Sequence, residues 1–257
     1  MKKLKWTVLT AGLALIMNAG FACGEGITAR AHIEPVMLVQ VKAEPEEFED
    51  EDFYATAGVV PDPLEPINRV FFVFNDRLYF WALKPAAKGY KAVVPGKARI
   101  GISNFFRNLA FPVRFVNCLF QGKLEGASEE LGSFLLNSIG GMGGFFDIAA
   151  YAGVRKYDED LDQSLAVFGF GPGFYINWPL FGPSTLRGTF GSAGDAFLNP
   201  VRYLDSSGAR VAVSATEIVN ETSFRVGDYE AMKRAALDPY VALRDAYYQN
   251  RLKKIQE

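Results

Sequence analysis

The stretch from Asp62 to Tyr90 restricts what this chain can fold into more than any other part of the sequence. It reads DPLEPINRVFFVFNDRLYFWALKPAAKGY, and a helical pattern places aromatic or aliphatic residues on nearly every side of it. A helix at a water-exposed surface keeps a polar face of comparable width, so a helix that is apolar all round lies in a large core or in lipid. Residues 75–77 (Asn-Asp-Arg) interrupt the apolar run and leave it shorter than the roughly 20 residues that a membrane span needs. We therefore expect a helix with Asp62 as its N-cap and Pro63 in its first turn. Pro85 should end this helix near Leu83, and the helix should not cross a membrane.

Residues 1–22 have the pattern of an export signal peptide. Three lysines precede an apolar run from Val8 to Met17, and Gly20-Phe21-Ala22 supplies the small residues that precede a signal-peptidase cleavage site. Cys23 then takes the first mature position, where bacterial lipoproteins receive their acyl chains. Gly20 and Phe21 fit the usual lipobox poorly. We expect lipidation at Cys23, with ordinary cleavage at Ala22 and an unmodified thiol as the alternative.

Residues 23–61 are predicted to be an N-terminal anchor followed by an acidic, flexible tether. The segment 44–52 (EPEEFEDED) holds seven acids in nine positions, which repel one another and keep the chain extended. From Phe53 onward the chain carries 22 basic and 20 acidic side chains, a balance that argues against nucleic-acid binding. We place one folded domain at residues 62–257.

The folded part of the sequence lacks the usual patterns of catalysis and of metal or cofactor binding. The single histidine, His32, lies in the tether, and Cys118 is the one thiol of the domain, which argues against triad catalysis and against a zinc site. We find neither a nucleophile elbow nor a P-loop. A group of four carboxylates is interpreted as a solvated turn: Asp158, Glu159, Asp160 and Asp162. We expect a protein that is not an enzyme and that needs no cofactor or metal.

The rest of the domain has helical patterns joined by apolar, glycine-rich connections. An amphipathic pattern covers residues 98–121, with Pro112 kinking or splitting it, and a further helix is expected at 123–138. The connections 139–153 and 167–183 are rich in glycine and aromatic residues, and neither shows a convincing alternating strand. Helical patterns return at 192–203, 209–226 and 238–254. The prediction is a mostly α, single-domain fold.

Short motifs occur in a fixed order from Asp62 to about Gln249, and together they resemble a known family. They include Asp62-Pro63-Leu64-Glu65, Asn68-Arg69, Phe74-Asn75, Lys84-Pro85, Ile102-Ser103-Asn104-Phe105, Phe134-Leu135-Leu136-Asn137-Ser138, Gly171-Pro172-Gly173, Gly182-Pro183-Ser184-Thr185-Leu186-Arg187 and Asp238-Pro239-Tyr240. In this order they resemble the MlaA (VacJ) family of outer-membrane lipoproteins. The resemblance implies a ring-shaped domain of amphipathic helices that lie in the plane of the membrane, in the periplasmic leaflet of the outer membrane, around an amphipathic channel.

The resemblance also implies a function and partners. Members of the family remove mislocalised phospholipid from the outer leaflet of the outer membrane and pass it to a periplasmic lipid chaperone of the MlaC type, and they associate with porin trimers. A structural lipoprotein that scaffolds a porin without conducting lipid is the alternative. A lipid-cleaving hydrolase is a third possibility, for which the sequence offers no recognisable nucleophile and base.

Several residues acquire expected roles from the resemblance. Phe74 lies where the channel is sensitive to change, and the polar channel or lipid-binding candidates are Asn75, Arg77, Arg107 and Arg114. Arginine is the better bidentate partner of a phosphate headgroup. A mobile segment beside the pore is expected at Gly140, Gly141, Gly143 and Gly144. Each polar candidate has an equally weighted reading as a buried packing or capping contact. Asp162 and Gly188 replace a glycine and an aspartate expected at the channel rim.

Overall fold

The computed structural model describes residues 60–256 of the 257-residue chain. The predicted signal peptide, Cys23 and nearly all of the predicted tether lie outside the described residues. The described elements, in chain order, are α3 (Glu65–Leu78), η2 (Tyr79–Leu83), α4 (Lys84–Val93), α5 (Gly96–Leu109), α6 (Phe111–Phe120), α7 (Leu124–Ile139), α8 (Ile148–Tyr151), α9 (Leu161–Val167), β1 (Tyr175–Trp178), β2 (Gly182–Thr185), α10 (Leu186–Leu198), η3 (Pro200–Tyr203), α11 (Ser207–Phe224), α12 (Asp228–Ala235) and α13 (Pro239–Gln256). The prediction of a mostly α fold is confirmed.

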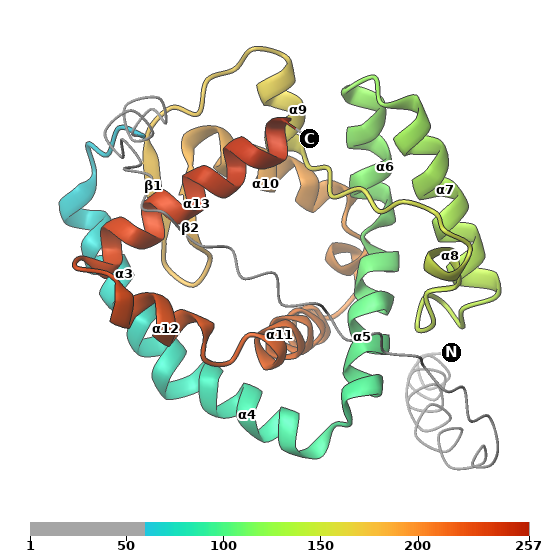
Figure 1. Ribbon diagram of the computed structural model, residues 1–257, viewed down its shortest axis with the longest axis horizontal. Helices are drawn as coiled ribbons and strands as arrows, with labels where there is room; N and C mark the ends of the chain where they lie inside the picture. Colours follow the sequence, from blue (N-terminus) through green and yellow to red (C-terminus); the bar gives the residue numbers. More distant parts are fainter. Residues whose placement is uncertain (1–59, 257) are drawn as a thin grey trace, which may run out of the picture. The chain divides into compact units, whose positions relative to one another are not determined.

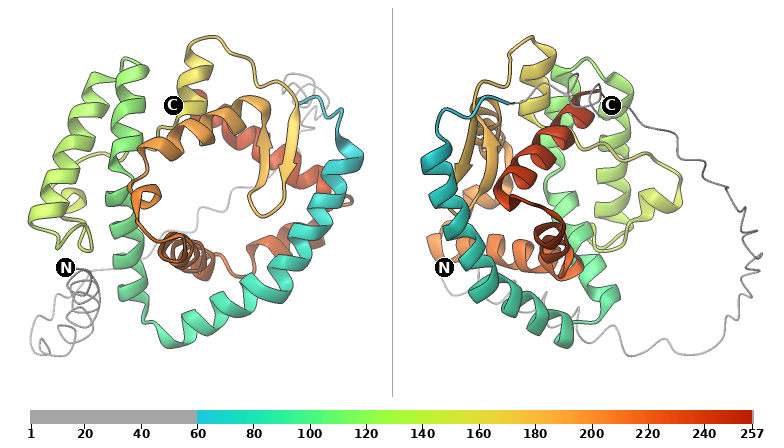
Figure 2. Two further views of the ribbon diagram at one scale, coloured as in Figure 1. Left: turned by 180° about the vertical axis from the view of Figure 1, so that it is seen from behind. Right: turned by 60° about the vertical axis from the view of Figure 1, so that its left-hand side comes forward.

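The helices of this unit follow one another around a ring. α3 and α4 form one side of it, α5 and α6 form the next, and α9, α10 and the strands β1 and β2 close it beside α3 (Figure 1). The chain then passes back beside α4 through α11 and α12 to α13 (Figure 1). α4 packs against α11, and α9 packs against α10. α7 packs on α6 and leads to α8, and these two helices form an outer lobe on the far side of α5 and α6 from the centre of the ring (Figures 1 and 2). The expected ring-shaped helical domain is thus confirmed.

The first helix does not end at Pro85, contrary to the prediction. It continues from α3 through the π-helical segment η2 into α4, where Pro85 occupies the first turn. The backbone N–H of Lys84 bonds to the carbonyl of Tyr79, five residues earlier. A proline in a regular helix lacks an amide donor and its ring collides with the carbonyl four residues before it. The wider π turn directly before Pro85 accommodates these defects, so that the helix continues to Val93.

Asp62 does not cap the first helix either. The N-cap is Leu64, without a side-chain hydrogen bond, and the Asp62 carboxylate instead accepts hydrogen bonds from Asn68 and Tyr240. Asp238, in the similar Asp-Pro motif, does receive the backbone N–H of Tyr240 at 2.9 Å, as expected of a helix start. The same dipeptide therefore serves tertiary packing at Asp62 and helix capping at Asp238, and the two motifs lie close together in the fold.

The second glycine-rich connection contains a β-hairpin that the sequence analysis missed. β1 and β2 pair antiparallel, with Tyr175 opposite Thr185 and Trp178 opposite Gly182. The strands are four residues each, too short for an alternating pattern to stand out from the surrounding aromatic residues. The helix α12 was also missed, whereas Pro112 does split the second helical region into α5 and α6.

The buried part of the domain is more polar than that of an ordinary globular protein. One small apolar cluster is buried, formed by Val60, Tyr175 and Tyr240. Thirteen polar or charged residues are buried: Asn68, Asn108, Arg114, Asn117, Glu130, Glu159, Asp162, Gln163, Ser164, Asn177, Thr185, Asn220 and Ser223. Large charged and amide side chains are normally on the surface of a water-soluble protein, so this interior reverses the usual distribution.

Candidate functional site

The exterior of the domain is as unusual as its interior, because large apolar side chains are exposed on nearly every helix. Trp81, Ile139 and Phe181 expose 78%, 84% and 87% of their surface. Further exposed examples occur on α3, α5, α7, α10 and α11, among them Val70, Ile100, Leu135, Phe190 and Val211. Among residues 60–256, no helix is both long and apolar enough to cross a membrane. Apolar surface of this extent indicates contact with lipid or with another protein.

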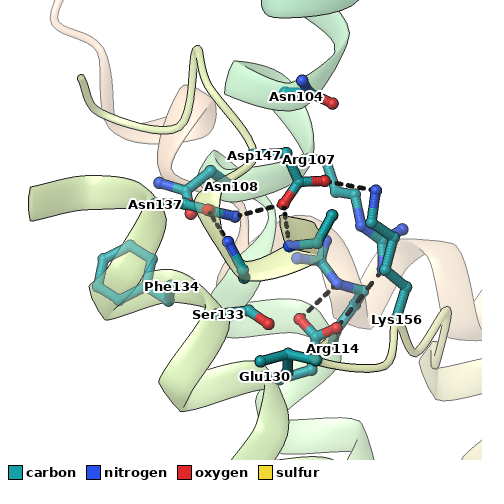
Figure 3. Close-up of a pocket in the computed structure, with 13 residues that line it drawn as sticks. Asn104, Arg107, Asn108, Arg114, Glu130, Ser133, Phe134, Asn137, Asp147 and Lys156 are labelled. Carbon is teal, nitrogen blue, oxygen red and sulfur yellow. Dashed lines mark hydrogen bonds and ion pairs between the residues drawn. The ribbon is translucent and has the colours of Figure 1, made fainter. Parts of the chain in front are cut away.

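Arg114 and Arg107 converge on one buried carboxylate, that of Glu130 on α7. The Arg114 Nε atom lies 2.8 Å from Glu130 Oε2, and the Arg107 Nη2 atom lies 3.5 Å from Oε1 (Figure 3). Arg107 also donates to the backbone carbonyl of Tyr157 at 2.6 Å. Burial lowers the pKa of Arg114, and the charge of Glu130 opposes that effect. A buried charge without a partner is very unfavourable, and here each charge has one.

These contacts direct both arginines into the outer lobe, away from the centre of the ring. The small cavity beside them has a volume of about 20 Å³ and is lined by residues such as Asn104, Asn137, Asp147 and Lys156 (Figure 3). That volume holds about one water molecule and no lipid headgroup. Arg114 therefore has a buried packing role, and Arg107, whose side chain is 31% exposed, is paired with the same carboxylate. Their expected role in lipid binding receives no support from this geometry.

Phe74, Asn75 and Arg77 lie near the end of α3, beside the β-hairpin. Asn75 donates to the backbone carbonyl of Trp178 at 2.8 Å and accepts the N–H of Leu180 at 2.8 Å, so its side chain holds the turn of the hairpin. Phe74 is 47% exposed. Arg77 is also exposed, and no ion pair to it occurs within the described residues. Of the five candidate channel residues, Arg77 is the one cation still available to a ligand.

The glycine segment between α7 and α8 lies in the outer lobe and packs on α5 (Figures 1 and 2). Gly144 has a φ of +99°, and a Cβ atom there would lie 2.3 Å from Cβ of Asn108. A Cβ atom on Gly141 would likewise lie 2.1 Å from the carbonyl oxygen of Phe146. Backbone hydrogen bonds from Gly143 to Ser138 and from Gly144 to Asn137 close the turn. Gly141 and Gly144 are thus required for close packing, and the mobility expected of Gly140, Gly141, Gly143 and Gly144 stays a prediction.

The acidic segment at the start of α9 is solvent-exposed at Asp158 but not at Glu159 and Asp162, so its interpretation as a solvated turn is only partly correct. Asp162 and Glu159 are buried, with 3% and 6% of their surface exposed. Asp162 lies between two arginines, at 2.7 Å from Arg187 Nε and 2.5 Å from Arg251 Nη2. Arg251 also forms a two-pronged contact with the two carboxylate oxygens of Asp160, each at 2.8 Å. These ion pairs fasten α13 and α10 to the start of α9.

Beside these ion pairs lies a polar cavity of about 150 Å³. Its lining includes the carboxylates of Asp160, Asp162 and Asp195, the guanidinium of Arg251 and the ring of Tyr247. Burial raises the pKa of Asp195, although the N–H of Leu161 and the Asn117 amide bond to its carboxylate and lower it. The cavity has room for several waters. Gly188 and Asp162, the two positions that the resemblance placed at the channel rim, both line this cavity.

Glu130, Arg187 and Arg251 are site residues that the sequence analysis did not single out. Glu130 follows Gly126 and Ala127 at helical spacing, and all three are buried. Residues three and four positions apart share one face of a helix, so this spacing could have placed Glu130 on the same face as the two small residues. Among residues 60–256 no group of three or more potential ligands could hold a metal ion. Burial raises the pKa of the Cys118 thiol to about 11, which leaves it protonated and unreactive at neutral pH.

Comparison with known proteins agrees with the fold and the motifs. The family model of the MlaA lipoprotein matches residues 60–254. The intermembrane phospholipid transport system lipoprotein MlaA of Shigella flexneri is 35% identical over 192 residues, 73% of this chain and 76% of its own length. The protein of the same name from Escherichia coli K12 is 34% identical over the same shares of each chain. A solved structure from work on the structural basis for maintenance of bacterial outer membrane lipid asymmetry is 31% identical. It superposes with a TM-score of 0.68 and covers 76% of this chain and 98% of its own. The chain therefore belongs to the MlaA lipoprotein family.

Proposed function

We propose that this protein transports phospholipid at the bacterial outer membrane. The observation that carries the proposal is the reversed distribution of side chains, with apolar residues exposed around the ring and charged or amide residues buried. Such a surface is unfavourable in water and favourable in the interfacial region of a bilayer, because its apolar area is removed from water there. Helices can be immersed in this region without spanning the membrane. The relatives named above are lipoproteins of an intermembrane phospholipid transport system.

The route we infer follows from the family resemblance. Phospholipid mislocalised in the outer leaflet enters an amphipathic channel within the ring and is handed to a periplasmic carrier of the MlaC type. The domain lies in the periplasmic leaflet, with Cys23 as the acyl anchor and with a porin trimer as a membrane partner. Residues 1–22 act as the signal peptide, residues 23–61 as anchor and tether, and residues 62–257 as the channel domain. Arg77 is the candidate for headgroup contact, because no described residue forms an ion pair with it.

We propose that the protein does this without chemistry of its own. Cleavage of an ester needs a nucleophile and a base within hydrogen-bond reach of each other. The Cys118 thiol is buried and protonated, and the carboxylates of the interior are engaged by arginine, lysine and amide groups. Lipid movement through such a protein is passive.

The test is lipid exchange in vesicles that contain the purified full chain. With a fluorescent phosphatidylethanolamine placed in one leaflet, we expect the protein to raise the rate of its appearance in the other leaflet or on an added carrier several-fold. No increase over protein-free vesicles would overturn the proposal. In that case, retention of porin binding would favour the scaffold alternative.

Arg77→Glu tests the proposed headgroup contact, with Arg234→Glu as the matched control. Both side chains are exposed, and neither forms an ion pair with another described residue, so each reversal leaves the packing intact. We expect the Arg77 variant to slow exchange and the Arg234 variant to behave as the wild type. Arg114→Glu is unsuitable for this purpose because it would place two carboxylates against each other in the interior.

A further inference from the structure

One flank of α4 carries a row of lysines. Lys84, Lys88 and Lys91 follow one another at spacings of four and three residues, which aligns them along one side of the helix. Trp81, one turn earlier in η2, is 78% exposed. Lys97 extends the row across the bend between α4 and α5. The α4–α5 edge of the ring thus carries lysines together with an exposed indole.

The inner face of α4 is occupied by packing, so the lysine flank faces outward. Ala87 is fully buried, and the Tyr90 hydroxyl donates to Asn220 on α11 at 2.9 Å. These two residues lie three apart and set the side of α4 that contacts α11. Lys88, Lys91 and Lys97 are all exposed. The part of the flank that carries Lys88 and Lys91 is therefore open to a ligand.

Three of the four lysines have no ion-pair partner among residues 60–256. Lys84 is paired with Glu230 at 2.5 Å, but Lys88, Lys91 and Lys97 form no ion pair with any residue of the described part of the chain. Glu221, on the neighbouring α11, accepts a hydrogen bond from the Ser103 hydroxyl and forms no ion pair with these lysines. Lys97 lies in the first turn of α5, the end of a helix that disfavours a cation and favours an anion. The patch therefore has an unsatisfied positive charge.

We propose that Lys88, Lys91 and Lys97, together with Trp81, form a binding site for the headgroups of anionic phospholipid. The proposal rests on the proposed function, since it requires the apolar surface of the ring to lie in a leaflet. Tryptophan is enriched at the headgroup level of a bilayer, and lysine stems lie along apolar surface while their ammonium groups reach the phosphates. The edge formed by α4 and the start of α5 then fixes the depth of the ring in the leaflet and concentrates anionic lipid beside it.

Vesicle flotation tests this site. The full chain carrying Cys23→Ser, so that an acyl anchor does not dominate, is mixed with vesicles of phosphatidylethanolamine containing either phosphatidylglycerol or phosphatidylcholine. We expect tighter binding to the phosphatidylglycerol vesicles, and we expect this preference to weaken with added salt. Each lysine near a charged membrane surface contributes about a fivefold change in affinity. The double variant K88Q/K91Q should lose most of the preference and keep its binding to phosphatidylcholine vesicles.

Two controls make the result specific. K88R/K91R keeps the charges and should keep the preference, whereas R155Q/R234Q removes two exposed cations from other parts of the domain and should also keep it. An equal loss in R155Q/R234Q would overturn the site in favour of a net-charge effect. Equal binding of the wild type to both vesicles would overturn it outright. Lipid exchange by a protein that shows no preference for phosphatidylglycerol vesicles would contradict the binding site alone. A preference for these vesicles without lipid exchange would contradict the transport function alone.

Discussion

Asn177 hydrogen-bonds twice to Asn68, across 109 positions of the sequence. Its backbone N–H donates to Asn68 Oδ1 at 2.8 Å, and its side-chain amide donates to the Asn68 carbonyl at 3.2 Å. Asn68 in turn donates to the carbonyl of Tyr175 at 3.1 Å. Both asparagines are buried, so water does not compete for these bonds. The pair joins α3 to strand β1 and fixes the hairpin to the side of the ring.

Asn68→Ala should therefore be strongly destabilising. It leaves the N–H of Asn177 and the carbonyl of Tyr175 without partners in the interior, at about 1–3 kcal/mol for each group. We expect the free energy of unfolding, measured by denaturant titration in mild detergent, to fall by about 2–5 kcal/mol. Asn75→Ala is the comparison, because its bonds to the hairpin turn are exposed and water can replace them. Equal effects of the two substitutions would contradict this account.

The helical part of the fold was predictable because its signals are local. The split at Pro112, the helix after Lys123 and the last helix from Asp238 each depend on capping, proline or periodicity within a few residues. Pro85 suggested the end of a helix, but the π turn before it lets the helix continue. That turn depends on a hydrogen bond between residues five positions apart, which a proline rule does not consider. The hairpin was missed because its strands are held by Asn68 and Asn75 from α3, and a sequence window does not contain those partners.

The site was harder to predict than the fold, and the reason is the polar interior. Arg107 and Arg114 were expected to contact lipid phosphates, but both face Glu130. A charged residue on an amphipathic helix is usually on the solvent side, and that assumption fails in a protein whose exterior is apolar. The same reversal buries Asp162 between Arg187 and Arg251. For this chain a lone charge in an apolar helix was a better indicator of an internal ion pair than of a ligand.

The Arg114–Glu130 pair should show strong coupling in a double-mutant cycle. Arg114→Met leaves Glu130 with only its longer ion-pair contact to Arg107, and Glu130→Gln leaves the buried Arg114 without a carboxylate, so each should cost about 3–5 kcal/mol. The double variant removes both charges and should recover a large part of that loss. Denaturant titrations of the four proteins measure the coupling. Additive effects of the two substitutions would show that the groups do not interact.

The glycines of the outer lobe should divide into those that tolerate alanine and those that do not. At Gly144 a Cβ atom would lie 2.3 Å from Cβ of Asn108, on a backbone with a φ of +99°, so alanine should destabilise the domain by several kcal/mol. At Gly132, within α7, a Cβ atom would meet nothing within 4 Å. Alanine there should stabilise the helix by about 1 kcal/mol. Thermal unfolding of the two variants gives opposite shifts if the packing is as described.

The contact between α12 and the start of α4 should depend on acid pH. Lys84 donates to the Glu230 carboxylate at 2.5 Å, and this bond holds the pKa of Glu230 at about 2, below its ordinary value of 4.5. A carboxyl whose pKa is lower in the folded state stabilises that state above its unfolded pKa, and the contribution is lost as the pH falls through the folded value. The stabilisation should thus be complete above about pH 4.5 and decline toward pH 2.

Glu230→Gln isolates this contribution. We expect the variant to unfold at a lower temperature than the wild type at pH 7, because Lys84 loses its charged partner. The difference between the two proteins should narrow as the pH is lowered from 4.5 toward 2, since the wild-type carboxylate then also becomes neutral. Glu125→Gln, at an exposed position of α7 without an ion pair to another described residue, should follow the wild type at every pH. A constant difference between the Glu230 variant and the wild type across this range would mean that the side chain acts through packing and not through its charge.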